Sequence, residues 1–185
     1  MNASRKYIVP GVTGLVLVAL FSLTIVNFFF RSKSTAGTKM VQDIKTLATV
    51  FHRIDAECGI IDFDHQKNSI NFLNVIAFKG SEVGSMNLRH PEKWQGAYLN
   101  DNPTMQDQEY QVVYTKKGYF ITPGEGVKLP NGKVIGKDII FDENADIDAL
   151  ARDGKDLSFE GNALAAPLKM TGNGAPVDQE SDLEM

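Results

Sequence analysis

The chain has 185 residues, 43% of them hydrophobic, and a formal net charge of −4. Basic residues form no patch interleaved with aromatic ones, which argues against a nucleic-acid partner. The single cysteine, Cys58, excludes an intrachain disulfide. We expect it to be a buried, inert thiol, with an intermolecular disulfide as the alternative.

The first predicted element is a membrane-spanning helix over residues 7–30, which carry no charged side chain. At about 1.5 Å per residue this helix is about 36 Å long, enough to cross a hydrocarbon core of about 30 Å. The stretch is longer than the apolar region of a signal peptide, so we expect a retained anchor. The predicted anchor residues along this stretch are Tyr7, Pro10, Leu17, Phe21 and Phe30.

The orientation of this span is predicted from its flanks. Residues 1–6 form a short stub that carries Arg5 and Lys6, while Arg31 and Lys33 follow the span, so the charge bias is weak. The short stub favours an inside N-terminus. We therefore expect a single-pass protein of the inner (cytoplasmic) membrane with a periplasmic or otherwise extracytoplasmic domain; a cytoplasmic domain is the alternative.

A second helix is predicted after a polar join over residues 31–38. Its apolar residues recur at the spacing of one helix face. They are Val41, Ile44, Leu47, Phe51 and Ile54. Gly59 is the predicted stop. Because the join contains no proline, we expect the two helices to run on as one rod with a soft kink at Gly37.

The middle of the chain carries weaker signals. Residues 69–78 are apolar, and periodicity does not separate helix from strand there; we favour a helix. Residues 80–102 are punctuated by glycines and a proline, which predicts a long loop packed by its own apolar side chains.

Strands are predicted from residue 109 onward. Residues 110–115 and 119–122 predict a hairpin with a glycine-containing turn. A second hairpin is predicted over residues 127–135, around Pro130-Asn131-Gly132, and a last strand over residues 138–141.

The C-terminal part is predicted to hold one short helix. Residues 144–152 fit a helix capped by Asn144. Residues 171–185 are rich in Gly, Pro and acidic residues and are predicted to be disordered. The predicted fold is α+β: a transmembrane helix continues into a long amphipathic helix packed on a small antiparallel sheet, with the soluble domain over residues 39–170.

The three histidines are the first candidates for chemistry. Zinc ligation by His52, Cys58 and His65 is conceivable, but their spacing matches no common zinc pattern. Together with His90, these histidines are better explained as ordinary surface or half-buried residues. We find no catalytic set and expect a protein that is not an enzyme; an anchored enzyme that uses these histidines is the least supported hypothesis.

Calcium is the second candidate. Residues 142–148 contain D-x-N-x-D-x-D, which resembles the start of a calcium loop and supplies Asp142, Asn144 and Asp146. Such a loop needs Gly at its sixth position and normally Glu at its twelfth, where this chain has Ile147 and Asp153. A capped helix start explains the same residues, so no cofactor is predicted and calcium is the alternative.

The layout resembles the type IV pilin-like proteins, and within them the major pseudopilin of type II secretion. The resemblance rests on the helix order and on the segment Trp94-Gln95-Gly96-Ala97-Tyr98-Leu99, similar to the W-x-G-P-Y-L-like segment of that group, with Ala97 where Pro is usual. Asn102-Pro103 before the first predicted strand is similar to the group's proline-containing turn. Only short pieces match, within a layout that covers residues 7–148.

The resemblance implies a structural subunit that assembles with itself or with other pilin-like subunits in a secretion or pilus-like apparatus. It also implies a calcium loop, to which Asp138 would belong. Family precursors carry a Gly followed by an apolar start with Glu five residues in. Gly11 and Gly14 could supply the Gly, but no Glu follows in the apolar stretch. The alternative is therefore a solitary, single-pass anchored binding or sensing domain outside any filament.

Overall fold

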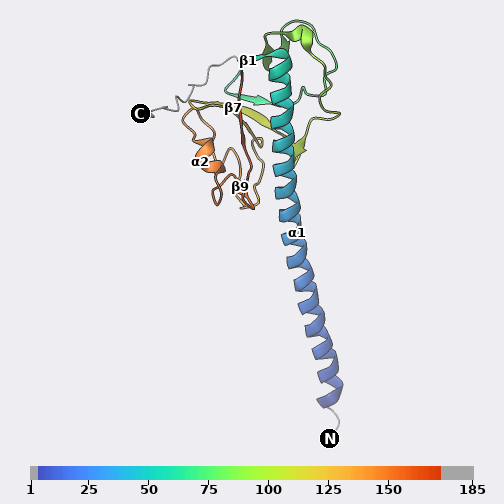
Figure 1. The fold of residues 1–185 in the computed structure, drawn as a ribbon. Coiled ribbons are helices and arrows are strands. Elements are labelled where there is room, and N and C mark those ends of the chain that lie inside the picture. The colour runs from blue at the N-terminus through green and yellow to red at the C-terminus, as the bar shows by residue number, and fades with distance from the viewer. Residues whose placement is uncertain (1–3, 172–185) are drawn as a thin grey trace, which may run out of the picture.

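The protein is dominated by one helix that carries a small domain near one end (Figure 1). The computed structural model describes residues 4–171; the surroundings of side chains are described for residues 15–25 and 34–171. Helix α1 (Ser4–Cys58) is continuous over 55 residues. Its N-terminal part projects away from the domain, and its C-terminal part packs against the sheets (Figure 1). The α+β class and the continuous long helix are therefore confirmed.

The domain half of α1 is buried along the predicted face. Ile44, Leu47, Phe51 and Ile54 are at most 2% exposed, and Val41 is half-buried. The ring of Phe51 stands edge-on to the rings of Phe63 and Phe72, which joins the helix to the rest of the core.

Helix α1 ends where the sequence predicts. Its last residue is Cys58, and Gly59 adopts a φ of +66°, while its N–H donates to the carbonyl oxygen of Asp55. The left-handed backbone conformation of Gly59 ends the helix, and its N–H satisfies one of the last free carbonyl groups. Glycine adopts this conformation without strain.

Two antiparallel sheets and two small hairpins form the β part of the domain. The four-stranded sheet has the order β11-β8-β7-β2. Its strands are Ala166–Leu168 (β11), Gly118–Thr122 (β8), Gln111–Thr115 (β7) and Lys67–Ser69 (β2). The three-stranded sheet has the order β1-β4-β3 and consists of Ile60–Phe63 (β1), Met86–Leu88 (β4) and Glu82–Val83 (β3). Helix α1 packs against β8 and β11.

The remaining elements are short. The hairpins are Thr104–Met105 (β5) with Gln108–Glu109 (β6), and Ser158–Phe159 (β9) with Asn162–Ala163 (β10). A 3-10 turn, η1, spans Pro91–Lys93, and helix α2 spans Ile147–Ala151.

The first predicted hairpin is confirmed. Strands β7 and β8 pair from Gln111 opposite Thr122 to Thr115 opposite Gly118. Gly118 has a φ of +111°, which a glycine adopts at no steric cost in the tight turn. This hairpin is the centre of the four-stranded sheet.

Two predictions for the middle of the chain are wrong. Residues 69–78 are not a helix: β2 ends at Ser69, and an irregular segment follows. Its backbone groups find separate partners, since Ile70 N–H donates to Tyr110 and Leu73 N–H to the side chain of Asn102. The long loop over residues 80–102 contains β3, β4 and η1, because strands of two or three residues leave no periodic signal.

The second predicted hairpin is only partly present. Lys128 and Val134 form an isolated bridge, and Gly132 has the expected positive φ of +92°. Residues 138–141 are not a strand; Ile139 forms a single bridge to Ile135.

The C-terminal helix is shorter than predicted. Asp146, not Asn144, is the N-cap of α2, and its carboxylate accepts the N–H of Ala149 at 3.1 Å. The side chain of Asn144 instead accepts a hydrogen bond from the ammonium of Lys116 at 2.6 Å. Strands β9, β10 and β11 were not predicted. Of the segment predicted to be disordered, residues 172–185 lie outside the described residues.

Candidate functional site on helix α1

The projecting part of α1 exposes apolar side chains on every side. All residues from Leu15 to Ile25 are exposed, and Leu17 and Phe21 reach 61% and 69%. Ser22 and Thr24 donate their hydroxyls to carbonyl oxygens one turn earlier, at 2.9 Å each. Even the polar side chains of this segment therefore satisfy their hydrogen bonds inside the helix.

The structure describes the side chains of only part of the predicted span, residues 15–25. Where side chains are described, no helix is long and apolar enough to cross a membrane. Tyr7, Pro10 and Phe30 lie outside the residues with described side chains, so the predicted anchor over residues 7–30 stays a prediction.

Gly37 marks the point where α1 enters the domain. A Cβ atom at this position would lie 2.6 Å from the ring of Phe159 in β9. The glycine thus lets the β9–β10 hairpin pack directly on the helix backbone, a close approach that a larger residue would block. The helix continues through Gly37, where a soft kink was predicted, and the glycine serves there as a packing surface.

Polar contacts hold the next two turns of α1. Lys39 donates to the carbonyl oxygen of Thr104 at 3.0 Å, and Lys45 to the side chain of Asn162 at 3.0 Å. The hydroxyl of Tyr110 donates to the carboxylate of Asp43 at 2.9 Å. Burial, and secondarily the negative charge of Asp43, raises the pKa of Tyr110 far above its usual value.

The Trp94–Leu99 segment packs around the C-terminal end of α1. The indole N–H of Trp94 donates to Val75 at 3.1 Å, and the hydroxyl of Tyr98 donates to the carboxylate of Glu57 at 2.7 Å. The rings of Trp94 and Tyr98 meet edge to face, with centroids 4.8 Å apart. Leu99 N–H donates to Leu73 at 3.1 Å. The structure thus brings the segment's predicted residues together, in a structural role.

Charged side chains add further contacts between the C-terminal end of α1 and the Trp94–Leu99 segment. The guanidinium of Arg53 hydrogen-bonds Glu57 and lies 5.3 Å from the centroid of the Tyr98 ring. The hydrogen bond from Arg53, followed by that from Tyr98, lowers the pKa of Glu57. Burial, and then the bond to Glu57, raises the pKa of Tyr98 well above its usual range. At Gly96, an added Cβ would lie 2.5 Å from the carbonyl oxygen of Val75, so this loop requires glycine there.

Asp55 joins the end of α1 to the end of the domain. Its carboxylate is buried and accepts the N–H of Ile60 at 2.9 Å, the N–H of Thr171 at 2.7 Å and the hydroxyl of Thr171. Cys58 is buried close by, and burial raises the pKa of its thiol. The prediction of a buried thiol is confirmed.

The histidines do not form a site in the described part of the chain. His52 and His65 are exposed, and His90 is half-buried with its Nδ1 3.3 Å from Glu92. Among residues with described side chains, no three His, Cys, Asp or Glu groups are placed to hold a metal.

The four calcium candidates act in turns and caps. Asp138 accepts the N–H of Val134 at 2.9 Å, and Asp142 that of Asn144 at 2.8 Å. Asp146 caps α2 and pairs with Lys117 at 2.6 Å. Each of the four, including Asn144 with its bond from Lys116, thus has at least one side-chain oxygen bonded within the chain.

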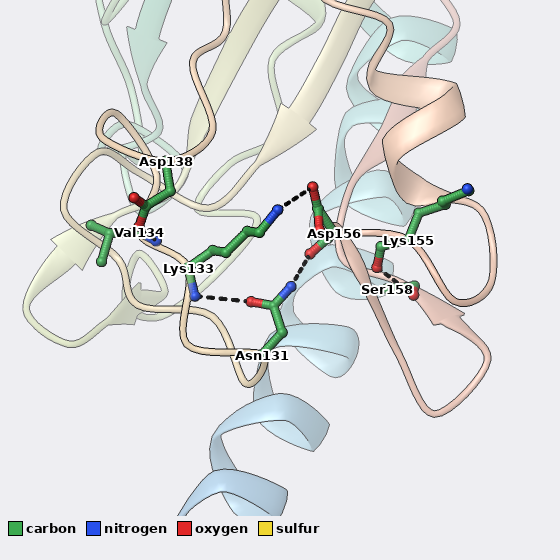
Figure 2. Close-up of polar contacts among 7 residues, drawn as sticks. All are labelled: Asn131, Lys133, Val134, Asp138, Lys155, Asp156 and Ser158. Carbon is green, nitrogen blue, oxygen red and sulfur yellow. Dashed lines mark hydrogen bonds and ion pairs between the residues drawn. The ribbon is translucent and has the colours of Figure 1, made fainter.

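A neighbouring cluster ties two loops of this region together (Figure 2). Asn131 donates to the carbonyl oxygen of Asp156 at 2.9 Å, and Lys133 pairs with its carboxylate at 2.7 Å. The turn at Pro130-Asn131-Gly132 is thereby fixed against the loop that leads into β9. This contact could not be predicted from the sequence, because the partners are more than twenty residues apart.

Comparison with known protein families, with characterised protein sequences and with solved structures finds no match.

Proposed function

We propose that this protein is a membrane-anchored, non-catalytic structural subunit, similar to a pseudopilin, that acts in a type II secretion or type IV pilus-like assembly. The observation that carries the proposal is the division of α1. One part of the helix is buried on its own domain, while residues 15–25 present an apolar surface that the domain does not cover.

The size of this exposed surface favours a binding partner or lipid. Eight large apolar side chains between Leu15 and Ile25 are 42–73% exposed. Burying a side chain of this kind contributes about 1.5–3 kcal/mol, so covering the segment would contribute on the order of 10 kcal/mol. A patch of this kind marks a protein or membrane contact.

Membrane insertion of the span over residues 7–30 is the first part of the proposal. The span has no charged residue and is flanked by Arg5, Lys6, Arg31 and Lys33. The internally bonded hydroxyls of Ser22 and Thr24 suit lipid, where every polar group needs a partner within the chain. We place the protein in the inner membrane as a single-pass protein with an extracytoplasmic domain.

Assembly through α1 is the second part. A rod that is rigidly held by its domain can present the same face to neighbours of the same kind, which suits a repeating assembly. The four residues singled out as calcium candidates take part in caps, turns and loop contacts instead, which supports a structural role.

The alternative is a solitary anchored binding or sensing domain. The absence of Glu from the apolar stretch favours it, because the resemblance implies that such a residue registers neighbouring subunits. Both proposals include the anchor. They differ in whether neighbouring subunits of the same kind pack against it.

Cysteine crosslinking in native membranes separates the two. A Leu17→Cys variant in a Cys58→Ser background is oxidised and separated on a non-reducing gel, with Asp153→Cys, in an exposed loop, as the control. Assembly through α1 predicts crosslinked dimers for position 17 and few for position 153; an amine-reactive crosslinker on the unsubstituted chain then gives a ladder. A monomer, or one foreign partner, in both experiments would contradict assembly.

A further inference from the structure

Two isoleucines stand out on the surface of the domain. Among the described domain residues, the large apolar side chains with the greatest exposure are Ile61, Ile76, Tyr114 and Ile140. Ile76 is 76% exposed and Ile140 is 62% exposed, whereas the other two are 40% and 41% exposed. Single exposed apolar residues are common, so the surroundings of these two isoleucines decide whether they belong to binding surfaces.

Ile76 is held outward by contacts on both sides of it in the chain. The carbonyl oxygen of Val75 accepts the indole N–H of Trp94 at 3.1 Å. The ring of Phe78 meets the ring of Trp94 edge to face, with centroids 5.3 Å apart. Val75, Phe78 and Trp94 are only half-buried, and Ala77 is exposed. Ile76 therefore belongs to a continuous apolar patch that its own domain leaves uncovered.

Ile140 is held outward in a similar way. Its neighbours Ile139 and Phe141 are 4% and 2% exposed and belong to the core. The carbonyl oxygen of Phe141 also accepts the side-chain amide of Gln66 at 3.4 Å. Because both neighbours are fixed in the core, Ile140 cannot turn inward without unpacking them.

The charge beside Ile76 is positive. Lys79 follows Phe78 in the chain, and Lys93 precedes Trp94. Both lysines are exposed, and no described residue pairs with either ammonium group. Glu92 contributes one carboxylate next to them, so the excess is one positive charge.

The charge beside Ile140 is negative. Residues 137–143 carry three carboxylates and one ammonium group, on Asp138, Asp142, Glu143 and Lys137. Lys116 bonds the next residue, Asn144, and adds a second ammonium group. The excess is therefore one negative charge. We call Ile76, Phe78, Lys79, Lys93 and Trp94 the Ile76 patch, and Asp138, Ile140, Asp142 and Glu143 the Ile140 patch.

We propose that the Ile76 patch of one copy of this chain binds the Ile140 patch of a second copy. Each patch holds an isoleucine that its own domain does not cover, and the two patches carry opposite charge. Burial of the isoleucines favours the contact, and the charges determine which patches meet. Because the two patches differ, each copy has one patch free for a further neighbour, and the contact can repeat from copy to copy.

This contact rests on the proposed function, because a small contact needs a high local concentration of chains. Anchored helices supply that concentration by holding the chains in one membrane. The contact adds a meeting of domain with domain to the assembly through α1.

Crosslinking in native membranes tests the contact. Ile76→Cys and Ile140→Cys are made on separate, differently tagged chains in the Cys58→Ser background, co-expressed, and treated with a short bismaleimide. We expect a heterodimer from the co-expressed chains and few dimers from either chain alone. Ile76→Cys co-expressed with Asp153→Cys, in an exposed loop, is the control. A yield equal to that of the control, dimers of Ile76→Cys alone, or a crosslink only to a foreign protein would overturn the proposal.

Charge reversal on one chain at a time tests the pairing. Lys79→Glu/Lys93→Glu on the Ile76→Cys chain, or Glu143→Lys on the Ile140→Cys chain, should lower the heterodimer yield about two- to fivefold, as expected for exposed ion pairs. Both reversals together should restore the yield. Glu143→Lys on the Ile76→Cys chain is the matched control and should leave the yield unchanged. Unchanged yields in all combinations, or a loss that the second reversal does not restore, would refute the pairing of these patches.

The crosslink at position 17 separates failure of this contact from failure of the proposed function. Dimers of Leu17→Cys without a heterodimer of Ile76→Cys and Ile140→Cys would refute the contact between domains and leave assembly through α1 in place. The absence of both crosslinks would contradict the assembly itself.

Discussion

At the scale of single residues, Asp55 connects three separate parts of the fold: helix α1, the start of β1 at Ile60, and Thr171. Its two oxygens accept three hydrogen bonds, one near the end of α1 and two from Thr171. A buried carboxylate is costly unless it is bonded in this way. The sequence offers no sign of this contact, because Asp55 sits among the polar residues of an amphipathic helix.

Asp55→Asn is expected to lower the free energy of unfolding by about 1–3 kcal/mol. One amide position cannot accept a hydrogen bond, so at least one N–H donor would face an NH₂ group. Urea denaturation of the full-length protein measures the effect. The exposed Asp153→Asn variant should change stability by less than about 0.5 kcal/mol. Equal stability of both variants would show that Asp55 does not hold Thr171.

Tyr110 gives a prediction for alkaline pH. Its pKa is raised in the folded state, so the folded protein binds its proton more tightly than the unfolded chain does. The resulting contribution to stability is fully present below the usual value of 10.0 and is lost as the pH rises through the folded value. We expect unfolding free energy to decrease above pH 10.0, and to decrease less steeply in Tyr110→Phe.

Urea denaturation on both sides of that pH checks this expectation. The matched control is Tyr114→Phe, which alters an exposed tyrosine of the same sheet. Tyr110→Phe should also lose about 1 kcal/mol at neutral pH, since it removes the bond to Asp43. An unchanged alkaline slope in Tyr110→Phe would show that another group causes the decrease.

At the scale of elements, the contact between α1 and the β9–β10 hairpin depends on Gly37. Gly37→Ala would place a Cβ against the ring of Phe159 and should destabilise the fold by about 1–3 kcal/mol through overpacking. The better helix propensity of Ala, worth about 1 kcal/mol, offsets part of this.

A double-mutant cycle in urea tests the contact. In a Phe159→Ala background the ring is absent, so Gly37→Ala should become neutral or stabilising. If Gly37→Ala had the same effect in both backgrounds, the close approach of the hairpin to the helix would be refuted.

Elements with a strong local pattern were predictable. The apolar face from Val41 to Ile54, the stop at Gly59 and the β7–β8 hairpin follow directly from periodicity and turn chemistry. Strands of two or three residues, such as β3 and β9, depend on tertiary partners and leave no such pattern.

The candidate site, like the fold, was only partly predictable from the sequence. The apolar stretch of α1 is evident from the sequence, whereas the contacts that position it are not. Lys39, Lys45 and Tyr110 each bond residues far away in the chain, and Gly37 matters only because a hairpin more than a hundred residues later lies against it.

At the scale of the whole molecule, the domain and the projecting helix should be separable. The side chains of residues 15–25 are exposed, so they are not part of the buried core of the domain. Deleting residues 1–33 is therefore expected to change the free energy of unfolding by less than about 1 kcal/mol and to abolish association with membranes. Circular dichroism in urea and membrane sedimentation measure the two effects.

A full-length Leu17→Asp/Phe21→Asp variant is the companion to this deletion. It keeps the chain length and should also weaken membrane association, because a charge in the middle of a span costs about 2.5–3.5 kcal/mol. Thr38→Asp, on the exposed polar part of α1, is the control. Persistent membrane association of the truncated protein would show that the domain itself binds the membrane.

The polar contacts that join α1 to the domain also have a mechanical consequence. Those described above run from Lys39 to Glu57, a distance of roughly 27 Å at about 1.5 Å per residue. They join the helix to separate parts of the domain, so a pull along the helix axis loads them in parallel. Detaching the helix then requires several bonds to break together, whereas a sideways pull at one end would break them in turn. In the proposed anchored protein, a pull on the domain along the helix axis would therefore load these contacts together.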